Sequence, residues 1–243
     1  MSLEAKLEPI LEQVQKPARY IGGELGSIIK EPDKVSVRFA FCFPDLYEIG
    51  MSHLGMKILY SIKNSREDVW CERVFAPAAD MEAQMREHDI PLYGLESLEP
   101  IREFDFIGFS LQYEMCYTTL LNMLDLAGLA VRSADRNNLA PIVMAGGPCA
   151  CNPEPLADFV DLFVLGEGEE VNLELIDLYQ QAKEEGWSKE EYLGRAAQIS
   201  GVYVPSLYEV TYREDGTVRA ITPKEGAPAK VSKRIIQDLD KVS

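Results

Sequence analysis

Short apolar runs ended by turn residues alternate along this chain with segments of helical spacing. Five such runs are found, at Val35–Phe43, Val69–Phe75, Asp105–Leu111, Ile142–Ala145 and Leu162–Leu165. Apolar runs of this length, bounded by glycine, proline or polar residues, are typical of strands that are buried on both faces of a parallel sheet. We therefore expect five parallel strands.

The segments between these runs predict helices. Apolar residues recur at helical spacing in 3–15, in 51–62 (Met51, Leu54, Ile58, Leu59 and Ile62 on one face), in 81–88 after a possible Asp80 N-cap, in 120–127 before Gly128, in 171–185, and after the Ser188/Glu191 capping pair. Strand–helix alternation of this kind predicts a Rossmann/flavodoxin-like, doubly wound α/β domain. The expected strand order is 2-1-3-4-5.

The pattern divides the chain into three parts. Residues 1–34 form a helix and an irregular arm, and residues 35–200 form the α/β domain. Residues 201–243 begin with a β-hairpin, predicted by two alternating segments around Glu214-Asp215-Gly216. The rest of this third part has the composition of a linker.

Charge and composition exclude several function classes. The chain of 243 residues has 24 basic and 40 acidic residues, which gives a net charge of −16. So acidic a surface repels phosphate backbones, and we expect no direct nucleic-acid binding. No apolar run is long enough for a membrane span, and no secretory signal opens the chain. Five cysteines without a disulfide framework indicate the cytoplasm.

Two glycine-rich turns follow the last two predicted strands. Gly146-Gly147-Pro148 follows the run at 142, and Gly166-Glu167-Gly168 follows the run at 162. Parallel strands bring such turns to one edge of the sheet, where open α/β folds bind ligands. Each glycine alone is explained equally well as a tight turn, but several together favour a binding site.

Several segments resemble the N-terminal, B12-binding-like region of an uncharacterised family of cobalamin-binding-type radical S-adenosylmethionine (SAM) proteins. The similar segments are PARYIGGE, FPDLYEIGMSHLG, FSLQYE, AGGPCACNPEPLADFVD, VLGEGEE and VYVPSLYE. The resemblance implies an accessory domain that presents cobalamin to, or shapes the active site of, a C-terminal radical SAM core. The substrate is unknown.

The cysteines bear on what this chain can do by itself. In the superfamily, C-x3-C-x2-C holds a [4Fe–4S] cluster. Here Cys42, Cys71, Cys116, Cys149 and Cys151 do not match that spacing. We therefore expect the cluster and SAM only in a full-length protein, and no catalytic residue or metal site in this chain. An isolated Cys149-Ala-Cys151 is weak support for zinc and is better interpreted as two loop thiols.

The resemblance also implies which residues hold cobalamin. A platform for the corrin would come from the loops after the first and third strands, and a slot for the nucleotide tail from the two glycine turns. The platform residues are Pro44, Asp45, Tyr47, Glu48, Gly50, Ser110, Leu111, Gln112 and Tyr113, and the slot residues are Gly146, Gly147, Pro148, Gly166, Glu167 and Gly168. Side chains at Gly147 or Gly168 are expected to interfere most with the tail.

Three further residues have other expected roles. His53 departs from the D-x-H-x-x-G pattern of cobalamin binders, and we do not expect it to ligate cobalt. His88 is expected to be a solvated surface residue. Glu169, like Glu167, is expected to lie at the start of the following helix, where negative charge is favoured, and contact with a ligand is the alternative. The alternative for the whole chain is a cofactor-free docking domain of the same fold.

Overall fold

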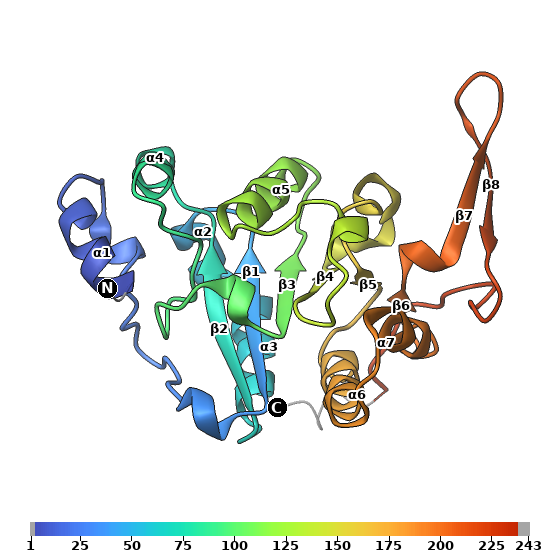
Figure 1. The fold of residues 1–243 in the computed structure, drawn as a ribbon, viewed down its shortest axis with the longest axis horizontal. Coiled ribbons are helices and arrows are strands. Elements are labelled where there is room, and N and C mark those ends of the chain that lie inside the picture. The colour runs from blue at the N-terminus through green and yellow to red at the C-terminus, as the bar shows by residue number, and fades with distance from the viewer. Residues whose placement is uncertain (1–2, 238–243) are drawn as a thin grey trace.

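The computed structural model describes residues 3–237, and its centre is one six-stranded sheet (Figure 1). The strands are β1 (Val37–Phe43), β2 (Val69–Phe75), β3 (Phe106–Ser110), β4 (Ile142–Gly146), β5 (Leu162–Val164) and β6 (Val202–Tyr203). They lie in the order β2-β1-β3-β4-β5-β6. The first five are parallel, which confirms the predicted order 2-1-3-4-5. The sixth strand was not predicted, and it pairs antiparallel with β5.

Helices cover both faces of the sheet. They are α1 (Leu3–Leu11), α2 (Tyr47–Ser52), α3 (Leu54–Asn64), α4 (Ala79–Glu87), α5 (Cys116–Leu126), α6 (Val171–Glu185) and α7 (Lys189–Ala196). Short 3-10 helices lie in the connections, at Pro17–Arg19, Pro32–Lys34, Ile101–Glu103, Ser133–Asp135, Pro148–Cys151, Glu154–Leu156 and Pro205–Leu207.

Polar contacts between helices show which of them are neighbours. Arg86 of α4 binds Asp125 and Asn122 of α5. On the other face, Arg66, which follows α3, binds Asp177 of α6. Figure 1 accordingly shows α4 beside α5, and α3 and α6 away from them. This two-faced arrangement is that of a doubly wound sheet.

Two helix predictions were wrong in detail. The N-cap of α4 is Ala78, and the Asp80 carboxylate accepts hydrogen bonds from the amides of Met81 and Gln15. The segment at 51–62 is broken at His53 into α2 and α3, which rotates the buried face. Leu54 and Ile58, predicted to be inside, are exposed, whereas Met56, Tyr60, Lys63 and Asn64 are buried.

Other helix predictions are confirmed. Gly128, with φ of 73°, lies just after the C-cap of α5, and the Ser188 hydroxyl accepts a hydrogen bond from the Glu191 amide at the start of α7. The hairpin is also present, as β7 (Tyr208–Tyr212) and β8 (Val218–Pro223). Figure 1 shows it projecting from the β6 end of the molecule.

The segment after the hairpin packs on the domain rather than continuing as a free linker. Arg234 forms a parallel bridge with Gly166, and its amide donates to the Leu165 carbonyl at 2.8 Å. Its guanidinium binds Glu170 and Glu174 on the first turns of α6. Ile236 is buried. The rest of the predicted linker, residues 238–243, lies outside the described residues.

The N-terminal arm covers the β2 edge of the sheet. Trp70 of β2 donates its indole N–H to the Ile28 carbonyl, and Tyr60 accepts from the Ile28 amide. Lys30 donates to the carbonyls of Asn64, Arg66 and Val69. These contacts shield an edge strand that would otherwise expose unpaired backbone groups.

Candidate ligand pocket

A pocket of about 330 Å³ lies between the sheet and the α3/α6 layer, at the carboxyl ends of β3, β4 and β5. Residues of one strand face form its wall, because alternate residues point to the same side of a sheet: Phe41 of β1 pairs with Gly108 of β3, and Gly108 with Met144 of β4. α3 contributes Gly55, Leu59 and Lys63 at intervals of four residues, which places them on one side of the helix.

Two glycines on the adjacent strands β3 and β4 lie in the pocket wall. A Cβ at Gly108 would lie 2.6 Å from the Phe39 ring. Gly146 lines the same wall with ordinary φ, and a Cβ there would meet Val164 at 3.7 Å, an unstrained contact. A side chain at Gly146 would therefore be tolerated by the backbone and would extend along the pocket wall.

The pocket contains eight of the fifteen residues predicted to form the site. These are Ser110, Gln112, Gly146, Gly147, Pro148, Gly166, Glu167 and Gly168. They include all six residues of the predicted slot. Of the platform, the structure brings only Ser110 and Gln112 into the pocket, and the Gln112 side-chain amide donates to the Ser110 hydroxyl at 2.8 Å.

The other seven predicted residues lie outside this pocket. Asp45 and Tyr113 join the two platform loops, since the Tyr113 hydroxyl donates to the Asp45 carboxylate at 2.5 Å. Glu48 is bound to Lys16 and Arg19 of the arm, and these hydrogen bonds lower its pKa to about 2. The remaining four pack against the protein itself. Pro44 and Leu111 are buried. Tyr47 lies beside the Phe75 ring, and Gly50 lies against the rings of Phe75 and Phe43.

At two of the slot positions, the backbone conformation itself requires glycine. Gly147 has φ of 94°, and a Cβ there would lie 2.7 Å from the Leu111 carbonyl oxygen. Gly166 has φ of 100°, and its Cβ would lie 2.2 Å from the Arg234 carbonyl oxygen. A side chain at either position would strain the fold whether or not a ligand binds. Gly147 is therefore a poor position at which to test ligand binding, contrary to the expectation from sequence.

His53 lies at the pocket and caps α3. Its Nδ1 accepts a hydrogen bond from the Met56 amide at 3.2 Å, so the neutral ring carries its proton on Nε2. A metal-bound histidine usually shows the reverse, with one nitrogen donating to a carboxylate and the other free to ligate. In this structure His53 caps a helix, and its lack of cobalt ligation stays a prediction.

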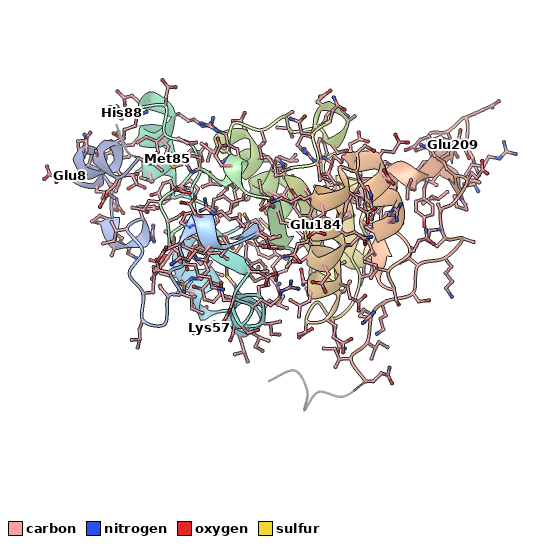
Figure 2. All side chains as sticks on the ribbon, turned by 60° about the horizontal axis from the view of Figure 1, so that its bottom comes forward. Glu8, Lys57, Met85, His88, Glu184 and Glu209 are labelled. Atoms are coloured by element: carbon pink, nitrogen blue, oxygen red, sulfur yellow. The ribbon has the colours of Figure 1, made fainter. Side chains whose placement is uncertain are left out.

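The remaining histidine and the loop cysteines lie in ordinary surroundings. His88 is exposed at the end of α4, on the α1 side of the molecule (Figure 2). Partial burial raises the pKa of Cys149, which disfavours the thiolate that a metal requires. Within residues 3–237, no three His, Cys, Asp or Glu side chains are grouped so that they could hold a metal ion.

Sequence reasoning missed the most buried charged residue of the pocket. Lys63 is 1% exposed, and its ammonium lies 4.6 Å and 4.7 Å from the ring centroids of Phe39 and Phe41. Burial lowers the pKa of Lys63 to about 8. Glu169 and Asn172 also line the pocket. A lone lysine in a helical segment gives no sequence signal, because most lysines in such positions are solvated.

The fold and the pocket define a class: an α/β domain with a pocket at the carboxyl edge of a parallel sheet, the usual place for ligands in such folds. The family described as radical SAM proteins, N-terminal, matches residues 55–205, more than half of the chain. This chain therefore belongs to that family of N-terminal regions and is an accessory region of a radical SAM protein.

A relative from Methanocaldococcus jannaschii is described as an uncharacterised protein. It is 26% identical over 195 residues, which cover 79% of this chain and 33% of that protein. The chain thus spans about a third of the length of this relative. No solved structure matches the chain. None of the helices in residues 3–237 combines the length and apolar character that crossing a bilayer requires.

Proposed function

We propose that this domain binds cobalamin for a radical SAM core, with the nucleotide tail of the cofactor in the pocket beside Gly108 and Gly146. In the complete protein, the core would hold the [4Fe–4S] cluster and SAM. Cobalamin, when bound, supplies a cobalt centre that carries a transferable group. The chain's own residues bind and orient the cofactor, and none of them is proposed to act as a catalyst.

The observation that carries this proposal is the hollow between the sheet and α3. A flat base requires a slot between a sheet and a helix, and Gly146 leaves the wall of this pocket open at the end of β4, where an added Cβ would meet Val164 only at 3.7 Å. The slot also has a hydrogen-bond donor that is unpaired among residues 3–237, the Lys63 ammonium, for the ring nitrogen of the base. The residues present therefore fit the tail.

The rim outside the pocket offers a surface for the corrin. Tyr113 and Asp45 connect the loops that follow β3 and β1. Nearby in the sequence, Ile49, Tyr113 and Met115 are 48%, 41% and 83% exposed. Exposed apolar side chains on such loops favour contact with a flat macrocycle, or with the core domain itself.

Direct titration tests the proposal. Hydroxocobalamin added to this chain is expected to change the visible spectrum and to raise the melting temperature. At 100 times the dissociation constant, the free energy of unfolding rises by about 2.7 kcal/mol. Gly146→Leu should abolish binding because its side chain would extend into the slot.

Two control variants accompany this titration. Gly194→Leu places the same side chain on α7, where an added Cβ would meet no heavy atom within 4 Å, and it should leave binding unchanged. His53→Ala should also bind, because His53 is not expected to ligate cobalt. Loss of binding in His53→Ala alone would show that the imidazole is a ligand after all.

The alternative is a cofactor-free docking domain, and one observation favours it. Leu54 and Ile58 on the outer side of α3 are 67% and 37% exposed. If millimolar cobalamin changes neither the spectrum nor the melting temperature, the docking role is the better description. Leu54→Glu should then weaken binding of a radical SAM core domain, whereas Lys57→Glu on the same helix serves as the matched control.

A further inference from the structure

Two buried polar groups face the same pocket without a partner among the described residues. The first is the Lys63 ammonium, which enters from the last turn of α3 and makes no hydrogen bond or ion pair with any residue in 3–237. It lies against the aromatic faces of Phe39 and Phe41, 4.6 Å and 4.7 Å from the ring centroids. Cation–π contacts stabilise an ammonium but leave its N–H donors free.

The second group is the Glu169 carboxylate. Its Oε2 is buried and accepts no hydrogen bond from the described residues. Glu169 is close enough to oppose the effect of burial on the Lys63 pKa, yet no ion pair of 4.0 Å or less joins the two side chains. The pocket therefore presents a donor and an acceptor that are separated from each other.

Asn172, which also lines the pocket, is not hydrogen-bonded to Lys63 or Glu169. Its side-chain amide donates to the Gly168 carbonyl at the start of α6, which holds the 166–169 turn in place. A buried charge without a partner, such as the Lys63 ammonium, is costly to a folded protein, and the half-buried Glu169 side chain of opposite sign remains apart from it. A ligand placed between them would satisfy both.

Resting on the proposed function, we propose that Lys63 and Glu169 together recognise an adenine base in the ligand's tail. Adenine presents a ring-nitrogen acceptor beside an exocyclic amine donor at N1 and N6, an edge that stays free whether the base is attached to ribose through N7 or through N9. Lys63 donates to the ring nitrogen, and Glu169 accepts from the amine. The dimethylbenzimidazole of cobalamin has the ring nitrogen but no donor, so it leaves Glu169 unpaired.

The test compares three probes by calorimetric titration: cobalamin, the corresponding corrinoid with adenine in its tail, and free adenosine. The wild-type domain is expected to bind the adenine corrinoid roughly tenfold to a hundredfold more tightly than cobalamin, because an unpaired buried acceptor penalises the latter. Adenosine distinguishes a free nucleoside from a corrinoid tail as the source of the base.

Variants assign the effect to each side chain. Glu169→Met should remove the preference, because it weakens the adenine corrinoid and relieves cobalamin of the unpaired acceptor, whereas Lys63→Met should weaken both corrinoids. Figure 2 shows Lys57 on α3 and Glu184 on α6, and both are exposed. Lys57→Met and Glu184→Met are therefore matched controls that should change nothing. Thermal unfolding of each variant checks that it is folded.

The outcomes separate the two proposals. If both corrinoids bind equally, or if Glu169→Met keeps the preference, the recognition of adenine is refuted while the cobalamin function stands. If adenosine alone binds, with the same dependence on Lys63 and Glu169, the recognition of adenine stands and the corrinoid function falls. If none of the three probes binds, both proposals are wrong.

Discussion

Lys63 is the residue whose surroundings depart furthest from what its type favours. A lysine at 1% exposure is rare, and this one has no carboxylate within ion-pair distance in residues 3–237. Its position in the pocket therefore costs stability in the absence of a ligand. Such costs are commonly retained at binding sites.

The charge of Lys63 predicts a pH dependence of stability. Its pKa is about 8 in the folded chain and 10.5 ordinarily, so the unfolded state binds more protons between these values. The free energy of unfolding of the wild type should rise from pH 8 to pH 10.5, relative to Lys63→Met, by on the order of 3 kcal/mol. Denaturant unfolding of both proteins at several pH values measures this difference, and parallel curves would refute it.

At the scale of elements, a buried ionic cluster ties β4 and β5 to α7. Asp161, just before β5, binds Arg136 at 3.2 Å and Lys189 of α7 at 2.9 Å, and all three side chains are at most 8% exposed. The same carboxylate accepts from the Val143 amide of β4 at 2.8 Å. One acid thus positions the strands that carry both glycine turns.

Breaking this cluster should destabilise the sheet. Asp161→Ala leaves two buried cations without their carboxylate, and we expect the free energy of unfolding to fall by about 3–5 kcal/mol. Asp158→Ala is the matched control, because Asp158 pairs with Arg132 at the surface and its loss should cost less than about 1 kcal/mol. Equal effects in chemical denaturation would contradict the structural role of Asp161.

The elements also show how far sequence reasoning reaches. Short apolar runs such as Ile142–Gly146 predict buried strands directly from the sequence, and the right-handedness of crossovers then allows only a few strand orders. The two residues of β6 are too few for any periodicity. The phase of α3 was misjudged because the break at His53 cannot be seen in the apolar pattern. Pairing through backbone amides, as at Arg234, leaves no mark on the sequence.

The candidate site was predictable to a similar degree. Glycines at strand ends mark a binding edge, and all six slot residues do line the pocket. Which glycines face a ligand depends on φ and on neighbours distant in sequence, as the contact of Gly166 with Arg234 illustrates. The place of Lys63 in the pocket could not be predicted, because charged residues in a helix are usually solvated.

At the scale of the whole molecule, the cysteines predict the iron content. Cys42, Cys71 and Cys116 are buried, in different elements, and burial raises the pKa of each thiol. Anaerobic reconstitution of this chain with iron and sulfide should leave no specific absorption near about 400 nm, since such bands require thiolate-bound iron. Stoichiometric iron that survives gel filtration would contradict this expectation.

The bridge between Gly166 and Arg234 makes the pocket and the C-terminal segment parts of one equilibrium. The turn at 166–169 carries pocket residues on one side and the backbone contacts of Arg234 on the other. A ligand that stabilises this conformation of the turn therefore also stabilises the packing of the segment around Arg234. Thermodynamic reciprocity then requires that displacing the segment weaken the ligand by the same factor. A ligand in the pocket would in this way be coupled to the surface of the domain through the contacts of Arg234 with Gly166, Glu170 and Glu174.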